Sequence, residues 1–280
     1  MLLSDILKDY RCSKRGLSGG APVIWISGLA KSGTTLVENI ASCCGYVDAN
    51  RSLLRNFYFK GSKKSGRVPE SLFDSLPRGK GSFLKSHTLY ETYIDNMLSD
   101  GAVKVIIPVR DIRDALVSRM FHVLSDKKHW QHDLICKYVD RPEKMFMASI
   151  SGMNPEQEIP QGEYFAKWID SWANSKFKDK MVWYESYIGD PENYIRTVAT
   201  LMGQAKINPN RVALEIKKQT SFIKTTTGSL WLRRFLFRGS SGTYRSGKIG
   251  SYSQYRSPES DDFFAQLGNK YKIYRQDIVH

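Results

Sequence analysis

The chain has 280 residues, 41% of them hydrophobic, which is enough for one substantial buried core, so we expect a single domain over residues 1–280. Its formal net charge of +14 is compatible with an anionic partner or ligand, because clustered Lys and Arg side chains concentrate negative species, although on charge alone a merely soluble surface is the commoner explanation. The basic residues are spread along the chain without a nucleic-acid-binding motif, which disfavours a nucleic-acid partner. No apolar run approaches the roughly 20 residues of a membrane-spanning helix, so we expect no membrane partner.

The first residues and the cysteines both favour a cytoplasmic protein. We expect residues 1–20 to form an extension with a short amphipathic helix, because Asp5 and Asp9 interrupt the apolar stretch that a signal peptide needs. The four cysteines are too few and too unevenly placed for a disulfide framework in a chain of this size. A reducing compartment fits this pattern best.

Short apolar runs alternate with segments of helical periodicity, a pattern typical of an α/β fold with a central parallel sheet flanked by helices. The runs that predict strands are Pro22–Ser27, Ser82–Ser86, Val103–Val109 and Met181–Glu185. Apolar spacing predicts helices with faces at Leu36, Val37, Ile40, Ala41 and Cys44, at Ile112, Ala115, Leu116, Arg119 and Val123, and over Tyr164–Trp172.

Three polar, aromatic and Gly-containing stretches do not fit the alternation: residues 45–81, 125–162 and 225–256. Long ordered loops in compact domains are usually functional, so we expect these stretches to be loop insertions over the active site. Their aromatic side chains could wall a pocket for a substrate, namely Phe57, Tyr58, Phe59, Trp130, Phe146 and Trp231.

A glycine-containing turn follows the first predicted strand and leads directly into the first predicted helix. Its sequence is Gly28-Leu-Ala-Lys31-Ser-Gly33-Thr-Thr35. A strand, a turn and a helix N-terminus together present backbone N–H groups to a phosphate, so we expect a P-loop-like site for a 5′-phosphate. In nucleoside-triphosphate loops a Lys follows the second Gly, whereas Thr34 follows Gly33 here. Lys31 should therefore reach a different atom of the ligand.

A second anion site is predicted after the third predicted strand. Arg110 ends that strand and Ser118 follows eight residues later, on the next helix. Arg offers a planar fork for phosphate oxygens and Ser a hydroxyl donor. The alternative is that Arg110, Asp111, Arg113 and Asp114 form only a solvated helix start.

These motifs resemble those of the sulfotransferases that use 3′-phosphoadenosine 5′-phosphosulfate (PAPS). Lys31-Ser32-Gly33-Thr34-Thr35 resembles the family's phosphosulfate loop, in which the lysine reaches the oxygen that bridges phosphate and sulfate. The family often has Trp next, stacked on adenine, where this chain has Leu36. The segment from Arg110 to Ser118 resembles the family's 3′-phosphate motif.

The resemblance extends to three further segments. Arg245-Ser246-Gly247, followed by Gly250, resembles the family's RKGxxG segment over the 3′-phosphate, with Ser246 in place of Lys. Tyr184-Glu185 and Thr220-Ser221-Phe222 are similar to its adenine-contacting segments. The resemblance implies a donor site made of Lys31, Ser32, Gly33, Thr34, Thr35, Leu36, Arg110, Ser118, Tyr184, Ser221, Phe222, Arg245, Ser246 and Gly247.

The segment Lys85-Ser86-His87 resembles the Lys-Thr-His segment that carries the family's catalytic base. An imidazole has a pKa near 6.5 and can take a proton from an acceptor near neutral pH. The resemblance implies in-line sulfuryl transfer from PAPS to a hydroxyl or amine of a small molecule, with PAP as product. We expect His87 to be the general base, Lys31 to stabilise the bridging oxygen and Lys85 to add positive charge, without a metal.

Two other functions are compatible with the phosphate loop: a P-loop kinase or NTPase, and a non-catalytic nucleotide- or RNA-binding protein. The first would need a lysine after Gly33 and the second leaves His87 without a role. His129, His132 and Cys136 have a spacing that a metal could use, but no fourth ligand accompanies them. No motif selects among acceptors, and none matches the short dimerisation motif of some family members.

Overall fold

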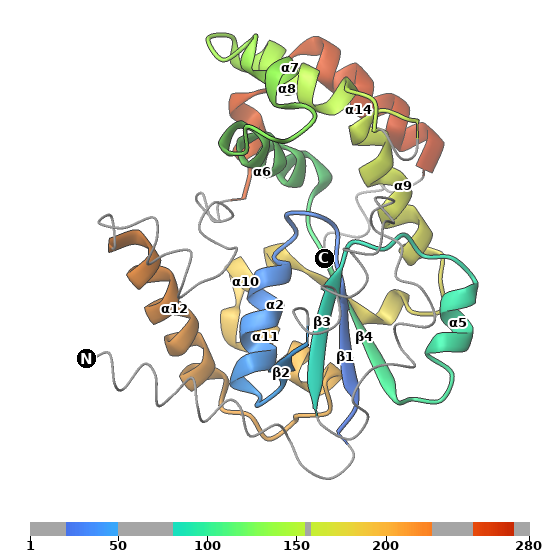
Figure 1. Ribbon diagram of the computed structural model, residues 1–280, viewed down its shortest axis with the longest axis vertical. Coiled ribbons are helices and arrows are strands. Elements are labelled where there is room, and N and C mark those ends of the chain that lie inside the picture. Colours follow the sequence, from blue (N-terminus) through green and yellow to red (C-terminus); the bar gives the residue numbers. More distant parts are fainter. Residues whose placement is uncertain (1–20, 50–80, 155–157, 226–248, 272–280) are drawn as a thin grey trace. The chain divides into compact units, whose positions relative to one another are not determined.

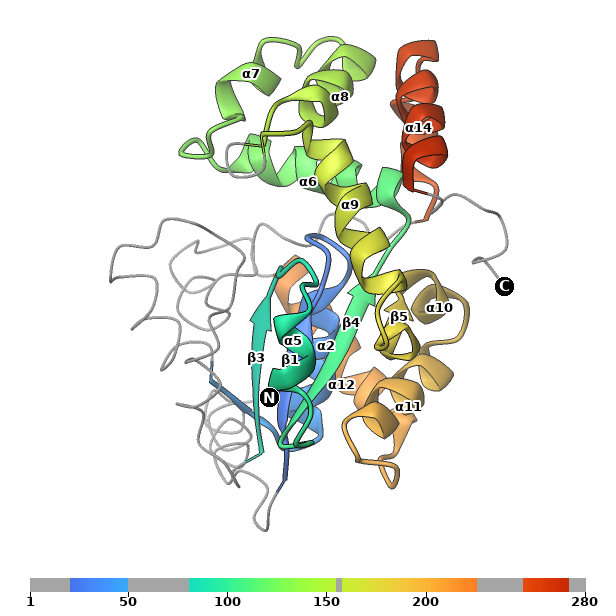
Figure 2. The same cartoon turned by 90° about the vertical axis from the view of Figure 1, so that its right-hand side faces the viewer.

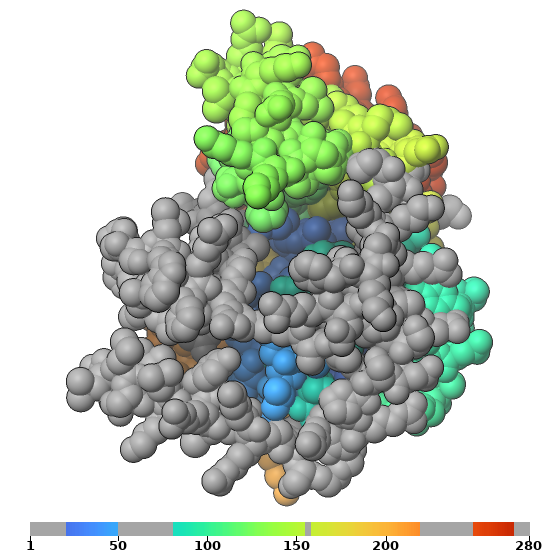
Figure 3. All heavy atoms as spheres, viewed as in Figure 1, coloured from blue at the N-terminus to red at the C-terminus, as the bar shows by residue number. Residues whose placement is uncertain are grey.

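The computed structural model describes residues 21–49, 81–154, 158–225 and 249–271, with the side chains of 219–225 excepted. The remaining residues are grey in Figure 3. The chain divides into two compact units. The first consists of Met1–Gly28, Gly33–Val109 and Asp179–Thr227, and the second of Leu29–Ser32, Arg110–Lys178 and Gly228–His280.

The first unit contains a five-stranded parallel sheet in the order β2-β3-β1-β4-β5. Figure 1 labels β2, β3, β1 and β4, and Figure 2 labels β5 beside β4. The strands are β1 (Val23–Ser27), β2 (Val47–Asp48), β3 (Ser82–Ser86), β4 (Val103–Val109) and β5 (Met181–Trp183). β1 is central, and every one of its residues is buried. The chain leaves β1 toward β3 on one side and later reaches β4 on the other. Ligands of open α/β sheets bind at the carboxyl ends of strands at such a switch point.

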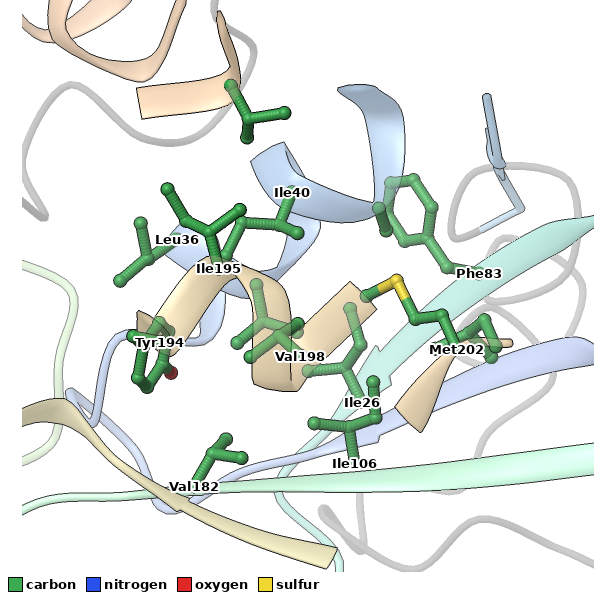
Figure 4. Close-up of a cluster of buried hydrophobic side chains, with 14 of the residues drawn as sticks. Ile26, Leu36, Ile40, Phe83, Ile106, Val182, Tyr194, Ile195, Val198 and Met202 are labelled. Carbon is green, nitrogen blue, oxygen red and sulfur yellow. The ribbon is translucent and has the colours of Figure 1, made fainter. Parts of the chain in front are cut away.

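Helices cover both faces of this sheet. They are α2 (Thr34–Cys43), α5 (Tyr93–Met97), α10 (Tyr184–Gly189), α11 (Pro191–Leu201) and α12 (Pro209–Thr225). Figure 2 shows α5 on the opposite face of the sheet from α2. Figure 4 shows one cluster of buried side chains from α2, α11 and the strands, among them Ile26, Leu36, Ile40, Ile106, Tyr194, Ile195 and Val198. Each buried aliphatic side chain contributes roughly 1.5–3 kcal/mol, so this cluster holds α2 firmly on the sheet.

The second unit is helical where it is described. Its elements are α6 (Ile112–Ser125), α7 (His132–Cys136), α8 (Pro142–Ser151), α9 (Gln161–Ala173), the 3-10 turn η2 (Ser251–Gln254) and α14 (Pro258–Tyr271). A further 3-10 turn, η1 (Lys178–Lys180), precedes β5. The buried Arg119 of α6 donates to Gln131 Oε1, and Gln131 Nε2 donates to the carbonyl of Ser149 in α8. This network ties the helices around α6 together.

The α/β class and the central parallel sheet are confirmed, and β3 and β4 have the predicted bounds. The fourth predicted strand was too long, because Tyr184 and Glu185 begin α10. β5 pairs only with β4, whose last residue Val109 lies opposite Trp183, so a longer β5 would have no partner. β2 was not predicted, since two residues carry too little pattern.

The stretch 125–162 is not an irregular loop, because it contains α7 and α8. Pro142 opens α8 and its buried residues follow helical spacing at Met145, Phe146, Ser149 and Ile150. Residues 1–20, 50–80 and 226–248 of the predicted extension and insertions lie outside the described residues. Among the helices that the structure describes, none combines the length and the apolar composition needed to cross a bilayer.

Candidate functional site

His87 is the first residue after β3, and hydrogen bonds fix the chain on both sides of it. Ser86 Oγ accepts from Trp25 Nε1 at 2.8 Å and lies 2.8 Å from Thr88 Oγ1. His87 Nδ1 is 2.7 Å from the carbonyl oxygen of Gly28. Because a carbonyl only accepts, Nδ1 carries the proton, and the lone pair of the neutral ring is then on Nε2. The exposed imidazole is therefore oriented as a proton acceptor at Nε2.

Gly28 joins β3 to the loop that follows β1. Its N–H donates to the carbonyl of Ser86 at 3.1 Å, while its own carbonyl accepts from His87. A Cβ at this position would overlap Thr34 Cγ2 and approach Pro108 Cδ to 3.2 Å. Only glycine fits without a shift of its neighbours, so the histidine and the start of the loop are held at a fixed spacing.

Lys31 lies in a closed turn with a strained backbone. Its φ of 70° falls in the left-handed region, which residues other than glycine rarely adopt. The buried Ser32 closes the turn, since both its hydroxyl and its N–H bond to the carbonyl of Leu29, at 2.6 and 3.1 Å. Such strain persists where surrounding contacts enforce it, and it is concentrated at functional sites.

Gly33 is the N-cap of α2, and no side chain caps this helix in the described part of the chain. Its φ is 87°, and the carbonyl accepts from the N–H groups of Leu36 and Val37. A Cβ on Gly33 would lie 2.7 Å from Cδ2 of Tyr184, so the aromatic ring packs directly on this backbone. The first N–H groups of α2, at Thr34 and Thr35, are thus presented beside a bare glycine, as phosphate binding requires.

Lys85 of β3 forms an ion pair that sequence reasoning missed. Its Nζ lies 2.7 Å from Glu38 Oε2 of α2. Burial raises the pKa of the Glu38 carboxyl, the Lys85 charge lowers it, and Asp48 raises it further. The Lys85 charge is therefore already opposed by a carboxylate. A signal for this pairing was present, because Glu38 is the one acidic residue of α2 and lies one turn after Thr34.

On the second unit, the predicted contacts Arg110 and Ser118 lie just before α6 and within it. Arg110 is 7% exposed, and its Nη2 lies 3.8 Å from Asp114 Oδ2. The half-buried Ser118 follows on α6, and His122 lies one turn beyond it. Burial lowers the pKa of His122, and the charge of Lys31 lowers it further.

The other predicted donor contacts fall partly within the described residues. Leu36 is 9% exposed and belongs to the apolar cluster on the sheet, as does Tyr184. Ser221 and Phe222 lie on α12, with side chains outside the described part. The predicted contacts Arg245, Ser246 and Gly247 also lie outside the described residues.

The possible metal ligands His129, His132 and Cys136 do not form a common site. Cys136 Sγ is 3.5 Å from His132 Nε2, whereas His129 stacks on Trp130. His129 Nδ1 accepts from the N–H of Gln131. Within the residues that the structure describes, no three His, Cys, Asp or Glu side chains are placed to hold a metal ion.

Solved structures with the same fold extend over nearly the whole chain. Retinol dehydratase in complex with retinol and PAP has a TM-score of 0.56 and 15% identity, covering 97% of this chain and 87% of that one. A mouse sulfotransferase, SULT7A1, complexed with PAP has a TM-score of 0.56 and 15% identity, covering 96% of this chain and 90% of that one. Retinol dehydratase with androsterone and inactive cofactor PAP has a TM-score of 0.55 and 15% identity, covering 97% of this chain and 86% of that one. At this identity the likeness shows the fold.

A comparison with curated protein sequences gave no match. The family model described as "Sulfotransferase domain" matches residues 21–270, which includes most of both compact units and every described residue of the candidate site up to Tyr252. The match covers the glycine-containing loop after β1, His87 after β3 and Arg110 after β4. On this evidence the chain belongs to the sulfotransferase family.

Proposed function

We propose that this sulfotransferase binds PAPS and moves its sulfuryl group to a hydroxyl or amine of a small-molecule acceptor, releasing PAP. The three solved structures of similar fold contain PAP, and the two of retinol dehydratase also contain retinol or androsterone. The observation that carries the proposal is the hydrogen bond from His87 Nδ1 to Gly28. It joins a proton acceptor to the first residue of a phosphate-binding loop.

The donor's two ends require two kinds of contact. The N-terminus of α2 supplies backbone N–H groups for the 5′-phosphate, because Gly33 leaves this end of the helix uncapped by any described side chain. Arg110 and Ser118 supply a guanidinium and a hydroxyl for the 3′-phosphate. Lys31 supplies its charge to the oxygen that bridges phosphorus and sulfur, where negative charge develops as the bond breaks.

His87 acts as general base in this proposal. Nε2 accepts the acceptor's proton while the acceptor oxygen or nitrogen bonds to sulfur and the bond between sulfur and the bridging oxygen breaks. The electron pair of the broken bond remains on PAP. Lys85 has a positioning role, because its ion pair with Glu38 links the strand of His87 to α2.

We also propose a cytoplasmic location. Cys43, Cys44 and Cys136 are free thiols in the structure, and a chain with adjacent free thiols suits a reducing compartment.

The donor assignment is tested by calorimetric titration of the purified protein with PAP, ATP and a single-stranded RNA. We expect binding of PAP at a Kd at least about 10-fold below that of ATP, because only PAP has a 3′-phosphate for Arg110. Tighter binding of ATP in the presence of Mg²⁺ would indicate a kinase or NTPase instead. Tighter binding of RNA would indicate a nucleic-acid-binding protein.

The base is tested with His87→Ala, assayed with labelled PAPS and a panel of phenols, alcohols and amines. We expect kcat to fall by roughly 10²- to 10⁴-fold while the Kd for PAP stays within about two-fold. The matched control His132→Ala changes a histidine of α7 and should keep normal turnover. Normal turnover of His87→Ala would remove His87 from the mechanism.

A further inference from the structure

Asp114 is a buried carboxylate that binds a distant part of the chain. It lies in the first turn of α6 and is 2% exposed. Its Oδ2 accepts the N–H of Gly250 at 2.7 Å, and Oδ1 accepts the N–H of Tyr252 at 3.0 Å. A carboxylate is costly to bury unless its oxygens are hydrogen-bonded, so these two bonds determine where the chain at Gly250 lies.

The same carboxylate holds the side chain of Arg110. Nη2 of Arg110 lies 3.8 Å from Oδ2, the oxygen that also accepts from Gly250. Both side chains are nearly buried, at 8% and 2% exposed, so solvent screens this attraction little. One group thus sets the position of the guanidinium and of a backbone turn 136 residues away in sequence.

The turn at Gly250 is fixed from its other side as well. Gly250 has a φ of 75° and is the N-cap of η2. The hydroxyl of Tyr252 donates to Asp261 Oδ1 at 2.8 Å and is 2.8 Å from Ser260 Oγ. The Tyr252 ring lies 5.5 Å from the ring of Phe146, centroid to centroid. Tyr252 is therefore anchored to α14 and α8, and Asp114 connects this anchor to the start of α6.

We propose that Asp114 is a positioning residue for the donor's 3′-phosphate, because it holds Arg110 at a fixed spacing from the turn at Gly250. The inference rests on the proposed function, which gives Arg110 the 3′-phosphate as its ligand. Asp114 itself faces the protein and does not touch the phosphate. Its carboxylate acts through the guanidinium and the turn that it holds.

The test compares two nucleotides that differ only in the 3′-phosphate, PAP and adenosine 5′-monophosphate (AMP), by calorimetric titration. In Asp114→Asn one acceptor oxygen becomes a donor, so one of the two backbone bonds is lost and the charge beside Arg110 disappears. We expect the Kd of PAP to rise roughly 10-fold or more, since such bonds to charged groups are strong, and the Kd of AMP to stay within about two-fold. If Asp114 only stabilised the fold, its replacement would raise the Kd of PAP and the Kd of AMP by the same factor.

The matched control is Asp111→Asn. Asp111 lies three residues earlier, and Asn also caps helices well, so the same chemical change leaves α6 intact without touching Gly250. The ratio of its affinity for PAP to its affinity for AMP should equal that of the unmodified protein. If Asp111→Asn lowers this affinity ratio as much as Asp114→Asn does, the loss of a negative charge near Arg110 is the cause and the positioning role is wrong.

Gly250→Ala covers the case in which Asp114→Asn does not fold. Among the described residues other than its chain neighbours, none has an atom within 4 Å of a Cβ at Gly250, so this change acts mainly on the turn's left-handed backbone. We expect the same selective loss of affinity for PAP, and no further loss in the double variant Asp114→Asn with Gly250→Ala. If either single variant keeps the preference of the unmodified protein for PAP over AMP, the inference is wrong while the proposed function stands. An unmodified protein that binds AMP as tightly as PAP would overturn the proposed function, and this inference with it.

Discussion

The two helices that follow β1 and β4 begin in different ways. α2 starts at Gly33, which has no side chain, and no described side chain caps the helix. α6 starts at Asp111, whose Oδ1 accepts the N–H groups of Arg113 at 2.9 Å and Asp114 at 3.3 Å. Two N–H groups in the first turn of α6 therefore have a side-chain acceptor within the chain, whereas the start of α2 has no described side-chain cap.

This difference indicates how each helix can bind a phosphate. α2 offers backbone N–H groups and the positive end of the helix dipole, which need a bare glycine and a fixed loop. α6 has used its backbone donors for Asp111 and offers side chains instead, at Arg110 and Ser118. A backbone site should be sensitive to glycine replacement, and a side-chain site to the shape of its cation.

The largest effect is expected from Gly33→Ala. The added Cβ would lie 2.7 Å from Tyr184 Cδ2, in a backbone with a φ of 87°, so the ring or the loop must move. We expect the Kd of PAP to rise by roughly 10²-fold or more, because the N–H groups of α2 lose their alignment. We also expect a loss of stability of about 1–3 kcal/mol, measured by urea unfolding.

Gly101→Ala is the matched control. Gly101 also has a positive φ, of 70°, but a Cβ there would meet no atom within 4 Å in the part of the chain that the structure describes. It should cost about 1 kcal/mol of backbone strain and leave PAP binding unchanged. Equal PAP affinity in the two variants would show that the bare glycine of α2 has no part in donor binding.

A smaller effect is expected from Arg110→Lys, which keeps the charge but removes the planar fork. We expect the Kd of PAP to rise about 10-fold, while AMP is little affected. Arg113→Lys is the control, because Arg113 pairs with Asp111 at 2.7 Å and its side chain is 43% exposed. A PAP affinity that Arg110→Lys leaves unaltered would mean that α6 does not bind the phosphate through this fork.

Much of the first unit could be predicted from sequence, because its signals are local. β1, β3 and β4 are short apolar runs that the sheet buries on both faces, and His87 and Gly33 belong to motifs that directly follow strands. The ion pair of Lys85 could not be predicted in this way. Glu38 meets it only because α2 packs on β3, 47 residues apart in sequence.

The second unit gave weaker signals. α7 has five residues and α8 ten, both within a polar stretch, so periodicity had little length in which to show. Asp114 looked like part of a solvated helix start, although it is buried. Asp114 can be buried because it accepts the N–H groups of Gly250 and Tyr252, and no sequence pattern near residue 114 indicates these partners.

The cap of α6 can be tested by Asp111→Ala. Two N–H groups of the first turn lose their acceptor, so we expect stability to fall by about 1 kcal/mol in urea unfolding. Asp190→Ala is the matched variant, since Asp190 caps α11 through the N–H of Asn193 and should cost a similar amount. If Asp111→Ala leaves the free energy of unfolding unchanged, the Asp111 cap does not stabilise α6, and the two helix starts do not differ in energy in the way argued above.

The smallest expected effect is on the pH dependence of stability. The second unit should show it, because titratable side chains such as His129 take part in its hydrogen bonds. Burial, with the charge of Arg119, lowers the pKa of His129 to about 4, and its Nδ1 must stay unprotonated to accept from Gln131. Between pH 6.5 and about 4 the unfolded chain therefore binds a proton that the folded chain does not, so this contribution is complete above pH 6.5 and is lost as the pH falls. In His129→Asn the amide oxygen can still accept but does not titrate, so the urea midpoint should fall less from pH 7.5 to 5 than in the unmodified protein. His132→Asn should keep the full acid loss, and an equal loss in all three proteins would exclude His129 as its source.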